Sequence, residues 1–173
     1  TEKGLHLDAQ FGYDWLKERY GENNIIVYGR SMGSGFAAKV ASYNHPKMLI
    51  LDAPYYSMVH LLQRYLPFIP VKNVTRFKVR TDKFLEEINC HVFIYHGTRD
   101  LTVPYSMGKR LAKLLGENAT LITIPGGGHN NLRDFPKYHE YMYYILGAIP
   151  TTELEPEKAY IPVAEEDFFD PIG

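Results

Sequence analysis

The chain has 173 residues and a formal net charge of −1, with 45% hydrophobic and 23% charged residues. These values are typical of one globular domain with its own core, and the charge gives no electrostatic case for nucleic-acid binding. No apolar run is long enough to span a bilayer, and a single cysteine, Cys90, excludes an internal disulfide framework. The first residues resemble neither a signal peptide nor a natural start. We therefore expect a cytoplasmic chain that begins within a longer protein, unless an upstream segment anchors it to a membrane.

Apolar side chains recur at helical spacing in residues 5–20, which predicts an amphipathic helix with one buried face. That face consists of Leu5, Ala9, Tyr13 and Leu16, widened by Phe11, Trp15 and Tyr20.

Short apolar runs and helical segments alternate along the rest of the chain. Strands are predicted at 25–29, 47–54, 91–97 and 119–126, each apolar on both faces as central parallel strands are. Helices are predicted at 32–43, at 106–116 and from about Asn131 to 149, the last tolerating Pro136 in its early turns. This alternation predicts an α/β fold, a mostly parallel sheet with helices on both faces.

Two segments interrupt this alternation. Residues 54–88 separate the second and third predicted strands, are rich in aromatic and basic side chains, and contain Pro67 and Pro70. An insertion of this size typically forms a lid or a binding element. Residues 151–173 hold seven acids against one lysine, a net charge of −6, so residues 1–150 carry +5. We expect a domain over 1–150 with a lid at 54–88, followed by an acidic tail at 151–173 that packs on the basic body or stays solvated.

The sequence VYGRSMGSG places Ser31 among three glycines, between a predicted strand and a predicted helix. In so tight a turn, Gly29 and Gly33, two residues before and after the serine, avoid side-chain clashes. Gly35 would let the helix pack close to the strand. The helix N-terminus directs free N–H groups and its positive dipole end toward Ser31. A hydroxyl held there can act as a nucleophile, with the N–H of Met32 stabilising the oxyanion that forms.

Two simpler interpretations of this motif are available. A loop rich in glycine and serine can be a plain connection, and a similar turn can hold a phosphate. A phosphate-binding loop would need a Lys-Ser or Lys-Thr pair at the start of the helix, and none is present in the sequence. The strand before the motif and the helix after it favour the nucleophile.

A serine nucleophile needs a base, and the base needs a group that orients it. Asp100 in HGTRDLTVP follows the third predicted strand, and His129 in IPGGGHNN follows the fourth. Because parallel strands end at one edge of a sheet, we expect both side chains near Ser31. Asp100 could instead only cap a helix, and His129 could be incidental to a turn at 126–128. The three loops together, in this chain order, favour a catalytic triad.

Asp52, which ends the second predicted strand, is a rival for the acid. We favour Asp100, because it lies in a true loop with room to point at His129. Asp52 is then expected to brace the turn at Ser31 or the start of the lid.

These motifs resemble the α/β-hydrolase superfamily, over roughly residues 5–148. YGRSMGSG resembles its nucleophile elbow, HGTRDLTVP its acid loop and GGGHN its histidine loop. GRSMG, LDAPYYS and GGGHNN are most similar to the branch that holds serine-aminopeptidase-like hydrolases, lysophospholipase-like bacterial proteins and membrane-associated acyl-protein thioesterases. The resemblance implies hydrolysis of esters, thioesters or amides with no metal or organic cofactor, and a lid over the acyl pocket, which matches residues 54–88.

The superfamily fold begins with further strands, one of which carries the loop that donates the first oxyanion-hole N–H. The resemblance therefore implies an N-terminally truncated fold with one sheet edge uncovered and open to association. Met32 supplies one donor, and losing the other typically costs about 100- to 1000-fold in turnover. We expect a fragment of a longer enzyme. A chain completed by a partner, and a weak or inactive remnant, are the alternatives.

Two functions of different class follow. The first is a serine hydrolase for acyl esters or thioesters, with amides as a further option and esters favoured over peptides. The second is a hydrolase-fold module that binds or assembles without catalysis.

For the first, we expect Tyr55, Met58, Leu62 and Tyr65 to line an apolar acyl pocket above Ser31, although these residues could equally pack as core. The expected substrate is a small-molecule or lipid-like acyl compound, and basic residues after the pocket could meet a membrane surface. The sequence indicates no oligomeric state.

Overall fold

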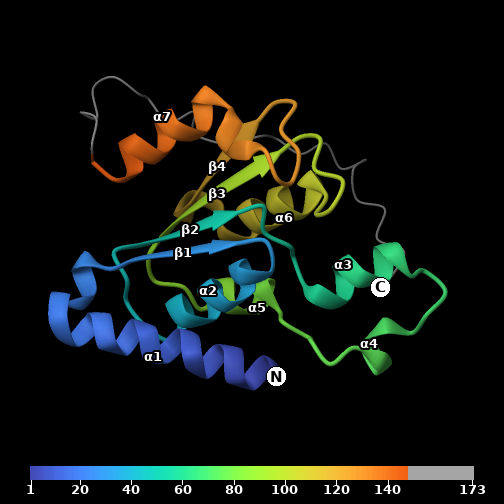
Figure 1. The fold of residues 1–173 in the computed structure, drawn as a ribbon, viewed down its shortest axis with the longest axis horizontal. Helices are drawn as coiled ribbons and strands as arrows, with labels where there is room; N and C mark the ends of the chain where they lie inside the picture. Colours follow the sequence, from blue (N-terminus) through green and yellow to red (C-terminus); the bar gives the residue numbers. More distant parts are fainter. Residues whose placement is uncertain (148–173) are drawn as a thin grey trace.

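The computed structural model describes residues 1–147, which form a four-stranded parallel sheet with helices on both faces (Figure 1). The strands are β1 (Ile26–Arg30), β2 (Met48–Asp52), β3 (His91–Gly97) and β4 (Ala119–Ile124). The helices are α1 (Glu2–Tyr20), α2 (Met32–Ser42), α3 (Met58–Tyr65), α4 (Val71–Val74), α5 (Thr81–Glu86), α6 (Tyr105–Leu115) and α7 (Pro136–Ile145). The predicted fold class is therefore confirmed. The acidic segment 151–173 lies outside the described residues.

The strands pair in the order β1-β2-β3-β4, and all neighbours are parallel. In the register, Arg30 lies opposite Asp52, and Asp52 lies opposite Tyr95. Because all the strands run in one direction, the loops that follow β1, β3 and β4 come together at the carboxyl edge of the sheet.

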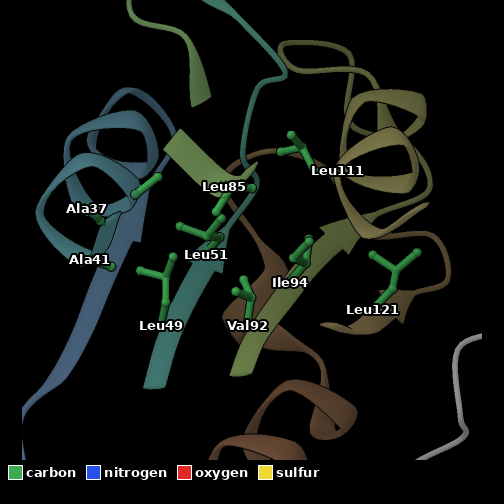
Figure 2. Close-up of a cluster of buried hydrophobic side chains, with 10 residues drawn as sticks. Ala37, Ala41, Leu49, Leu51, Leu85, Val92, Ile94, Leu111 and Leu121 are labelled. Atoms are coloured by element: carbon green, nitrogen blue, oxygen red, sulfur yellow. The ribbon is translucent and has the colours of Figure 1, made fainter. Parts of the chain in front are cut away.

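Both faces of the sheet are buried, as the doubly apolar strands predict. Along β2, Leu49 and Leu51 face a core shared with α2, α5 and α6, whereas Ile50 faces α7. Figure 2 shows the first of these cores, formed by Ala37, Ala41, Leu49, Leu51, Leu85, Val92, Ile94, Leu111 and Leu121. The second core lies under α7 and includes Tyr95, Ile122, Ile124, Tyr138 and Tyr141.

The apolar face predicted for the first helix is largely exposed in the described residues. Only His6 and Tyr13 of α1 are buried, whereas Leu5, Phe11, Trp15, Leu16 and Tyr20 are exposed. The reason is that α1 packs mainly along α2, and only Tyr13 and Ala9 reach the cluster that includes Val27 of β1. Beside it, β1 pairs only with β2 within residues 1–147, and a groove of about 330 Å³ lies between this strand and α1.

The last helix begins later than predicted. Leu132–Asp134 form a short 3-10 turn, and α7 starts at Pro136, which occupies its first turn. Proline is favoured at that position because its missing N–H would have no helical acceptor there. The chain therefore restarts at Pro136 and does not continue one helix from Asn131.

The insertion at 54–88 divides into two parts. α3 and α4 lie beyond the carboxyl edge of the sheet, whereas α5 packs between α2 and α6 and places Leu85 in the main core (Figures 1 and 2). No helix formed by residues 1–147 is both long enough and apolar enough to cross a membrane.

Candidate active site

Ser31 occupies the turn between β1 and α2 with φ 48° and ψ −122°. This positive φ is rare for a residue other than glycine and strains the backbone. Two contacts hold the turn: the N–H of Ser31 donates to the carbonyl of Asp52 at 2.8 Å, and the N–H of Ser34 donates to the carbonyl of Ser31 at 2.9 Å. The strain therefore persists because the neighbouring strand and the helix fix both ends of the residue.

The glycines around Ser31 have different structural reasons. A Cβ on Gly29 would lie 2.5 Å from the Cβ of Ala37 on α2, so only glycine allows this close contact of strand and helix. A Cβ on Gly35 would lie 2.3 Å from the hydroxyl of Tyr55, so Gly35 makes room for the segment after β2. The prediction that Gly35 lets the helix pack close to the strand is therefore wrong. At Gly33, no described atom lies within 4 Å of an added Cβ, so the predicted steric requirement is wrong at that position.

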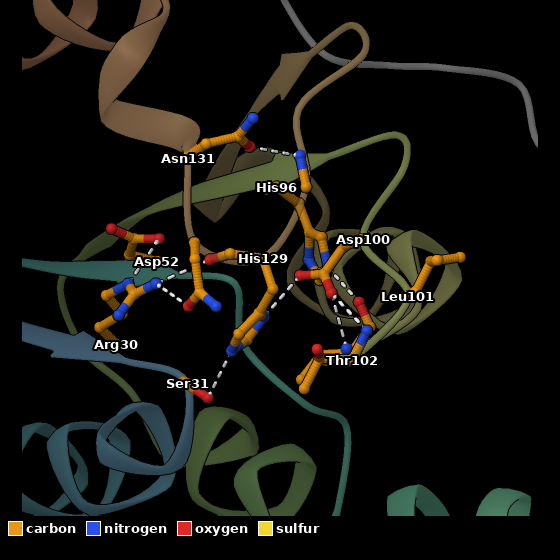
Figure 3. Close-up of polar contacts among 12 residues, drawn as sticks. Arg30, Ser31, Asp52, His96, Asp100, Leu101, Thr102, His129 and Asn131 are labelled. Atoms are coloured by element: carbon orange, nitrogen blue, oxygen red, sulfur yellow. Dashed lines mark hydrogen bonds and ion pairs between the residues drawn. The ribbon is translucent and has the colours of Figure 1, made fainter.

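The structure brings the side chains of Ser31, His129 and Asp100 into one chain of contacts (Figure 3). His129 Nε2 lies 2.8 Å from Ser31 Oγ, and His129 Nδ1 lies 2.7 Å from Asp100 Oδ2. If Nδ1–H donates to the carboxylate, Nε2 is left to accept the serine proton. Both distances lie within hydrogen-bond range and fit a nucleophile, a base and an orienting acid.

The carboxylate of Asp100 is buried, and the oxygen that does not face His129 accepts two backbone hydrogen bonds. Oδ1 accepts from the N–H groups of Thr102 at 2.9 Å and of Val103 at 2.7 Å, which leaves Oδ2 to face His129. His96 lies on the other side, with Nε2 at 3.6 Å from Oδ2 and 2.9 Å from the carbonyl of Val103. Burial lowers the pKa of His96, so its ring is neutral near pH 7 and does not compete for the carboxylate as a cation.

Backbone contacts join the acid loop to the histidine loop. The N–H of Arg99 donates to the carbonyl of Gly127 at 2.8 Å, and the N–H of Gly126 donates to the hydroxyl of Thr98 at 2.9 Å. A Cβ on Gly97 would lie 2.2 Å from the carbonyl oxygen of Gly127. The glycines at these positions therefore bring the two loops close enough for Asp100 and His129 to meet.

Met32 is the first residue of α2, and its N–H lies in the first turn, where a helix offers no backbone acceptor. The backbone carbonyl of the same residue accepts a hydrogen bond of 3.3 Å from the buried hydroxyl of Tyr55. The role of the Met32 N–H as an oxyanion donor stays a prediction. Within residues 1–147, no three His, Cys, Asp or Glu side chains gather in an arrangement that could hold a metal ion.

Comparisons with known proteins show similarity to lipases and esterases, although no protein-family model matches the chain. The lysophosphatidylserine lipase ABHD12 of Danio rerio is 30% identical over 142 residues, which cover 70% of this chain and 36% of that protein. The Xenopus tropicalis protein of the same name is 25% identical over 161 residues, which cover 83% and 42%. Among solved structures, the acetyl xylan esterase from Paenibacillus sp. R4 has a TM-score of 0.66 at 19% identity and covers 84% of this chain.

The chain belongs to the α/β-hydrolase superfamily. It matches 52% of the acetyl xylan esterase chain and about two fifths or less of the two lipases. The predicted resemblance is thereby confirmed at the level of the superfamily.

Within the α/β-hydrolase fold, Asp52 takes a bracing position and does not contact His129. Its side chain is 1% exposed, and Oδ2 accepts from the hydroxyls of Tyr28 at 2.6 Å and Tyr138 at 3.1 Å. Its backbone carbonyl accepts from the N–H of Ser31. Asp52 thus ties the nucleophile turn to α7.

The four residues predicted to line an acyl pocket differ in exposure. Tyr55 is fully buried beneath the nucleophile turn, so in this structure it supports that turn and does not face an open space. Met58 and Leu62 are half-buried on α3. Tyr65 is exposed, and its hydroxyl lies 2.6 Å from the carbonyl oxygens of both Leu101 and Thr102 beside Asp100. A pocket wall formed by Met58, Leu62 and Tyr65 stays a prediction.

Sequence reasoning missed Arg30, whose side chain links the nucleophile turn to the histidine loop. Arg30 Nη2 donates to the carbonyl of His129 at 2.7 Å and to Asn130 Oδ1 at 3.0 Å (Figure 3). Its Nε lies 3.9 Å from Asp52 Oδ1. The position of Arg30 immediately before Ser31 was visible in the sequence, but nothing in the motif indicates that its side chain turns toward the histidine loop.

Proposed function

We propose that the protein containing this chain is a serine hydrolase that cleaves acyl esters. The observation that supports this proposal is the continuous contact from Ser31 Oγ through the imidazole of His129 to the carboxylate of Asp100. A general base in contact with a serine hydroxyl, itself oriented by a buried carboxylate, is the arrangement that makes serine a nucleophile.

The proposed reaction has two halves. Ser31 Oγ attacks the ester carbonyl while His129 Nε2 takes its proton, and the N–H of Met32 donates to the oxyanion. His129 then passes this proton to the leaving alcohol, which leaves an acyl ester on Ser31. Water attacks that ester through His129 and releases the acid. Asp100 stays ionised and holds the imidazole in the required tautomer.

The substrate class is proposed from the relatives and from the lid. The relatives carry the name lysophosphatidylserine lipase, and a lysophospholipid offers an acyl ester with an apolar tail. Half-buried Met58 and Leu62 lie on α3, where an acyl chain could contact them. We therefore propose a lipid-like acyl ester, with a thioester as the second option because it presents the same carbonyl chemistry.

A fluorophosphonate probe tests the reaction class in the full-length protein. Labelling of the wild type and loss of labelling in Ser31→Ala support an activated serine at this position. Ser42→Ala is the matched control, because Ser42 is the last residue of the same helix, α2, and its hydroxyl bonds to the carbonyl of Lys39 at 2.8 Å. If the wild type is never labelled, the proposal is wrong and a non-catalytic binding module becomes the better interpretation.

A series of p-nitrophenyl esters tests the substrate class. Each methylene that enters an apolar pocket should raise kcat/KM by a factor equivalent to at most about 0.8 kcal/mol, until the pocket is full. A flat series from acetate to octanoate, unchanged by Leu62→Asp, would contradict an acyl pocket against α3.

A further inference from the structure

The turn between α3 and α4, residues 66–70, carries large apolar side chains in solvent, and we refer to it as the lid tip. Phe68 is 98% exposed, and its neighbours Leu66 and Ile69 are 42% and 43% exposed. Leu101, at 87%, lies beside the lid, because the hydroxyl of Tyr65 contacts its carbonyl oxygen. Large apolar side chains exposed together in one turn are uncommon on a free protein and point to an interaction site.

The backbone of the lid tip has few polar groups left for water. Gln63 Nε2 donates to the carbonyls of Leu66, Pro67 and Ile69 at 2.9, 3.1 and 3.1 Å. The N–H of Ile69 donates to the carbonyl of Leu66, and the two prolines, Pro67 and Pro70, have no N–H at all. Moving backbone groups into an apolar medium is costly when they lose hydrogen bonds. Here most of them keep their partners within the chain.

The surface next to the lid tip is strongly basic. Residues 53–80 contain five lysines and arginines and no acid: Arg64, Lys72, Arg76, Lys78 and Arg80. Arg80 pairs with Asp82, whereas no carboxylate in residues 1–147 forms a salt bridge with the other four. Arg76 and Lys78 also line an open hollow of about 580 Å³ against α1 and α2, together with Lys3, Lys39 and one acid, Glu2. The apolar tip is thus bordered by cations that have no acidic partner among the described residues.

The lid tip extends beyond the carboxyl edge of the sheet, the edge at which Ser31 and His129 lie (Figures 1 and 3). A partner that binds the lid tip therefore approaches the molecule from the end that carries the candidate site.

We propose that the lid tip docks on a lipid bilayer that contains anionic lipids. Phe68 and Ile69 enter the boundary between head groups and acyl chains, Gln63 keeps the tip carbonyls bonded there, and Lys72 and Arg76 meet the anionic head groups. A bilayer with anionic lipids offers an apolar interior for the exposed side chains and negative head groups for the neighbouring cations. A neutral protein partner would leave those cations without an opposite charge. The proposal goes beyond the proposed function and does not depend on turnover.

Vesicle co-sedimentation of the full-length protein tests this inference. Phosphatidylcholine vesicles are compared with vesicles of phosphatidylcholine and phosphatidylserine in a 7:3 ratio. Phe68→Ser should lower the partition coefficient on the mixed vesicles about tenfold or more. The matched control is Phe11→Ser, because Phe11 is 72% exposed on α1, and it should bind as the wild type does.

Lys72→Glu should lower binding to the mixed vesicles by about fivefold or more, whereas Lys47→Glu, at the opposite end of the sheet, should not.

Gln63→Ala tests the backbone part of the argument, because it removes the amide that bonds the tip carbonyls while leaving every apolar side chain in place. We expect weaker vesicle binding. Ser31→Ala should bind vesicles like the wild type, which separates failure of docking from failure of catalysis. Equal binding of wild type and Phe68→Ser to the mixed vesicles would overturn the proposal. So would a vesicle-free dimer that Phe68→Ser converts to a monomer, because the tip would then bind a second copy of the protein.

Discussion

Arg30 and His129 are joined by a hydrogen bond of 2.7 Å from the guanidinium Nη2 to the backbone carbonyl oxygen of the histidine. Arg30 directly precedes Ser31, so one side chain connects the nucleophile turn to the loop that carries the imidazole. The same guanidinium reaches Asn130 Oδ1 and faces the buried carboxylate of Asp52. The distance between Ser31 and His129 is therefore held by contacts outside the three proposed catalytic side chains.

We expect Arg30→Gln to lower kcat for a soluble ester about 10- to 100-fold with little change in KM. The reason is that loss of a charged hydrogen bond worth about 1.5–3 kcal/mol releases the histidine loop. Arg30→Lys should recover part of kcat, because it keeps the charge but loses the fork of donors. Arg99→Gln is the control, since Arg99 is an exposed residue of the acid loop. An unchanged kcat for Arg30→Gln would show that the contact does not position His129.

Ser31 and His129 should behave as one catalytic unit. Ser31→Ala and His129→Ala are each expected to abolish ester hydrolysis above the residual rate, and the double variant should be no slower than either single variant. Steady-state rates of the three variants on one p-nitrophenyl ester provide the measurement. If the two losses multiplied, the residues would act independently and the proposed proton transfer between them would be wrong.

The two buried carboxylates should separate activity from stability. Asp100→Asn is expected to lower turnover by roughly 10⁴-fold, because the neutral amide no longer selects the required tautomer of His129. Asp52→Asn should retain much more activity, but it should lower the free energy of unfolding by about 1–3 kcal/mol, since it disturbs the bonds to Tyr28 and Tyr138. Initial rates and urea unfolding of both variants test this ranking. The reverse ranking of the rates would assign the acid role to Asp52.

The arrangement of elements could be predicted because the strands are buried on both faces and therefore read as continuous apolar runs. Once the strands are parallel, the positions of Ser31, Asp100 and His129 after three of them require a common edge. Their contact distances depend on close backbone packing at Gly97 and Gly127, which a sequence indicates only as glycine-rich loops.

Other features could not be predicted, because they depend on which neighbour an element meets. Leu5 and Leu16 of α1 have helical spacing but are exposed, since α1 packs mainly along α2. Arg30 looks like an ordinary surface residue in the motif, and its role arises only when the loop after β4 comes within reach. Gly33 was assigned a steric role by its symmetry with Gly29 about Ser31, yet it faces open space among the described residues.

The difference between the two glycines can be tested directly. Gly29→Ala should destabilise the protein by about 1–3 kcal/mol, because its Cβ would overlap with Ala37 and with the carbonyl oxygen of Gly33. Gly33→Ala should be neutral or stabilising by up to about 1 kcal/mol, because it lies in the first turn of α2 with space around it. Thermal unfolding of both variants gives the comparison. Similar Tm values would contradict the close contact at Gly29.

Stability should also depend on pH through a buried histidine that is not part of the candidate active site. His6 is 8% exposed, packs against Phe36, and has no hydrogen bond to either ring nitrogen within residues 1–147. Burial and the nearby charge of Lys39 lower the pKa of His6 below its ordinary value of 6.5, while Glu2 opposes them. The unfolded chain therefore takes up a proton below pH 6.5 that the folded chain does not, and the free energy of unfolding falls as the pH falls. The free energy of unfolding changes by at most about 1.4 kcal/mol per pH unit for one such histidine.

Urea unfolding at pH 7.5 and 5.5 should show a smaller loss of unfolding free energy for His6→Gln than for the wild type. His45→Gln, at an exposed position, is the matched control. An identical loss in His6→Gln and the wild type would show that His6 is not neutral in the folded protein or does not contribute to this pH dependence.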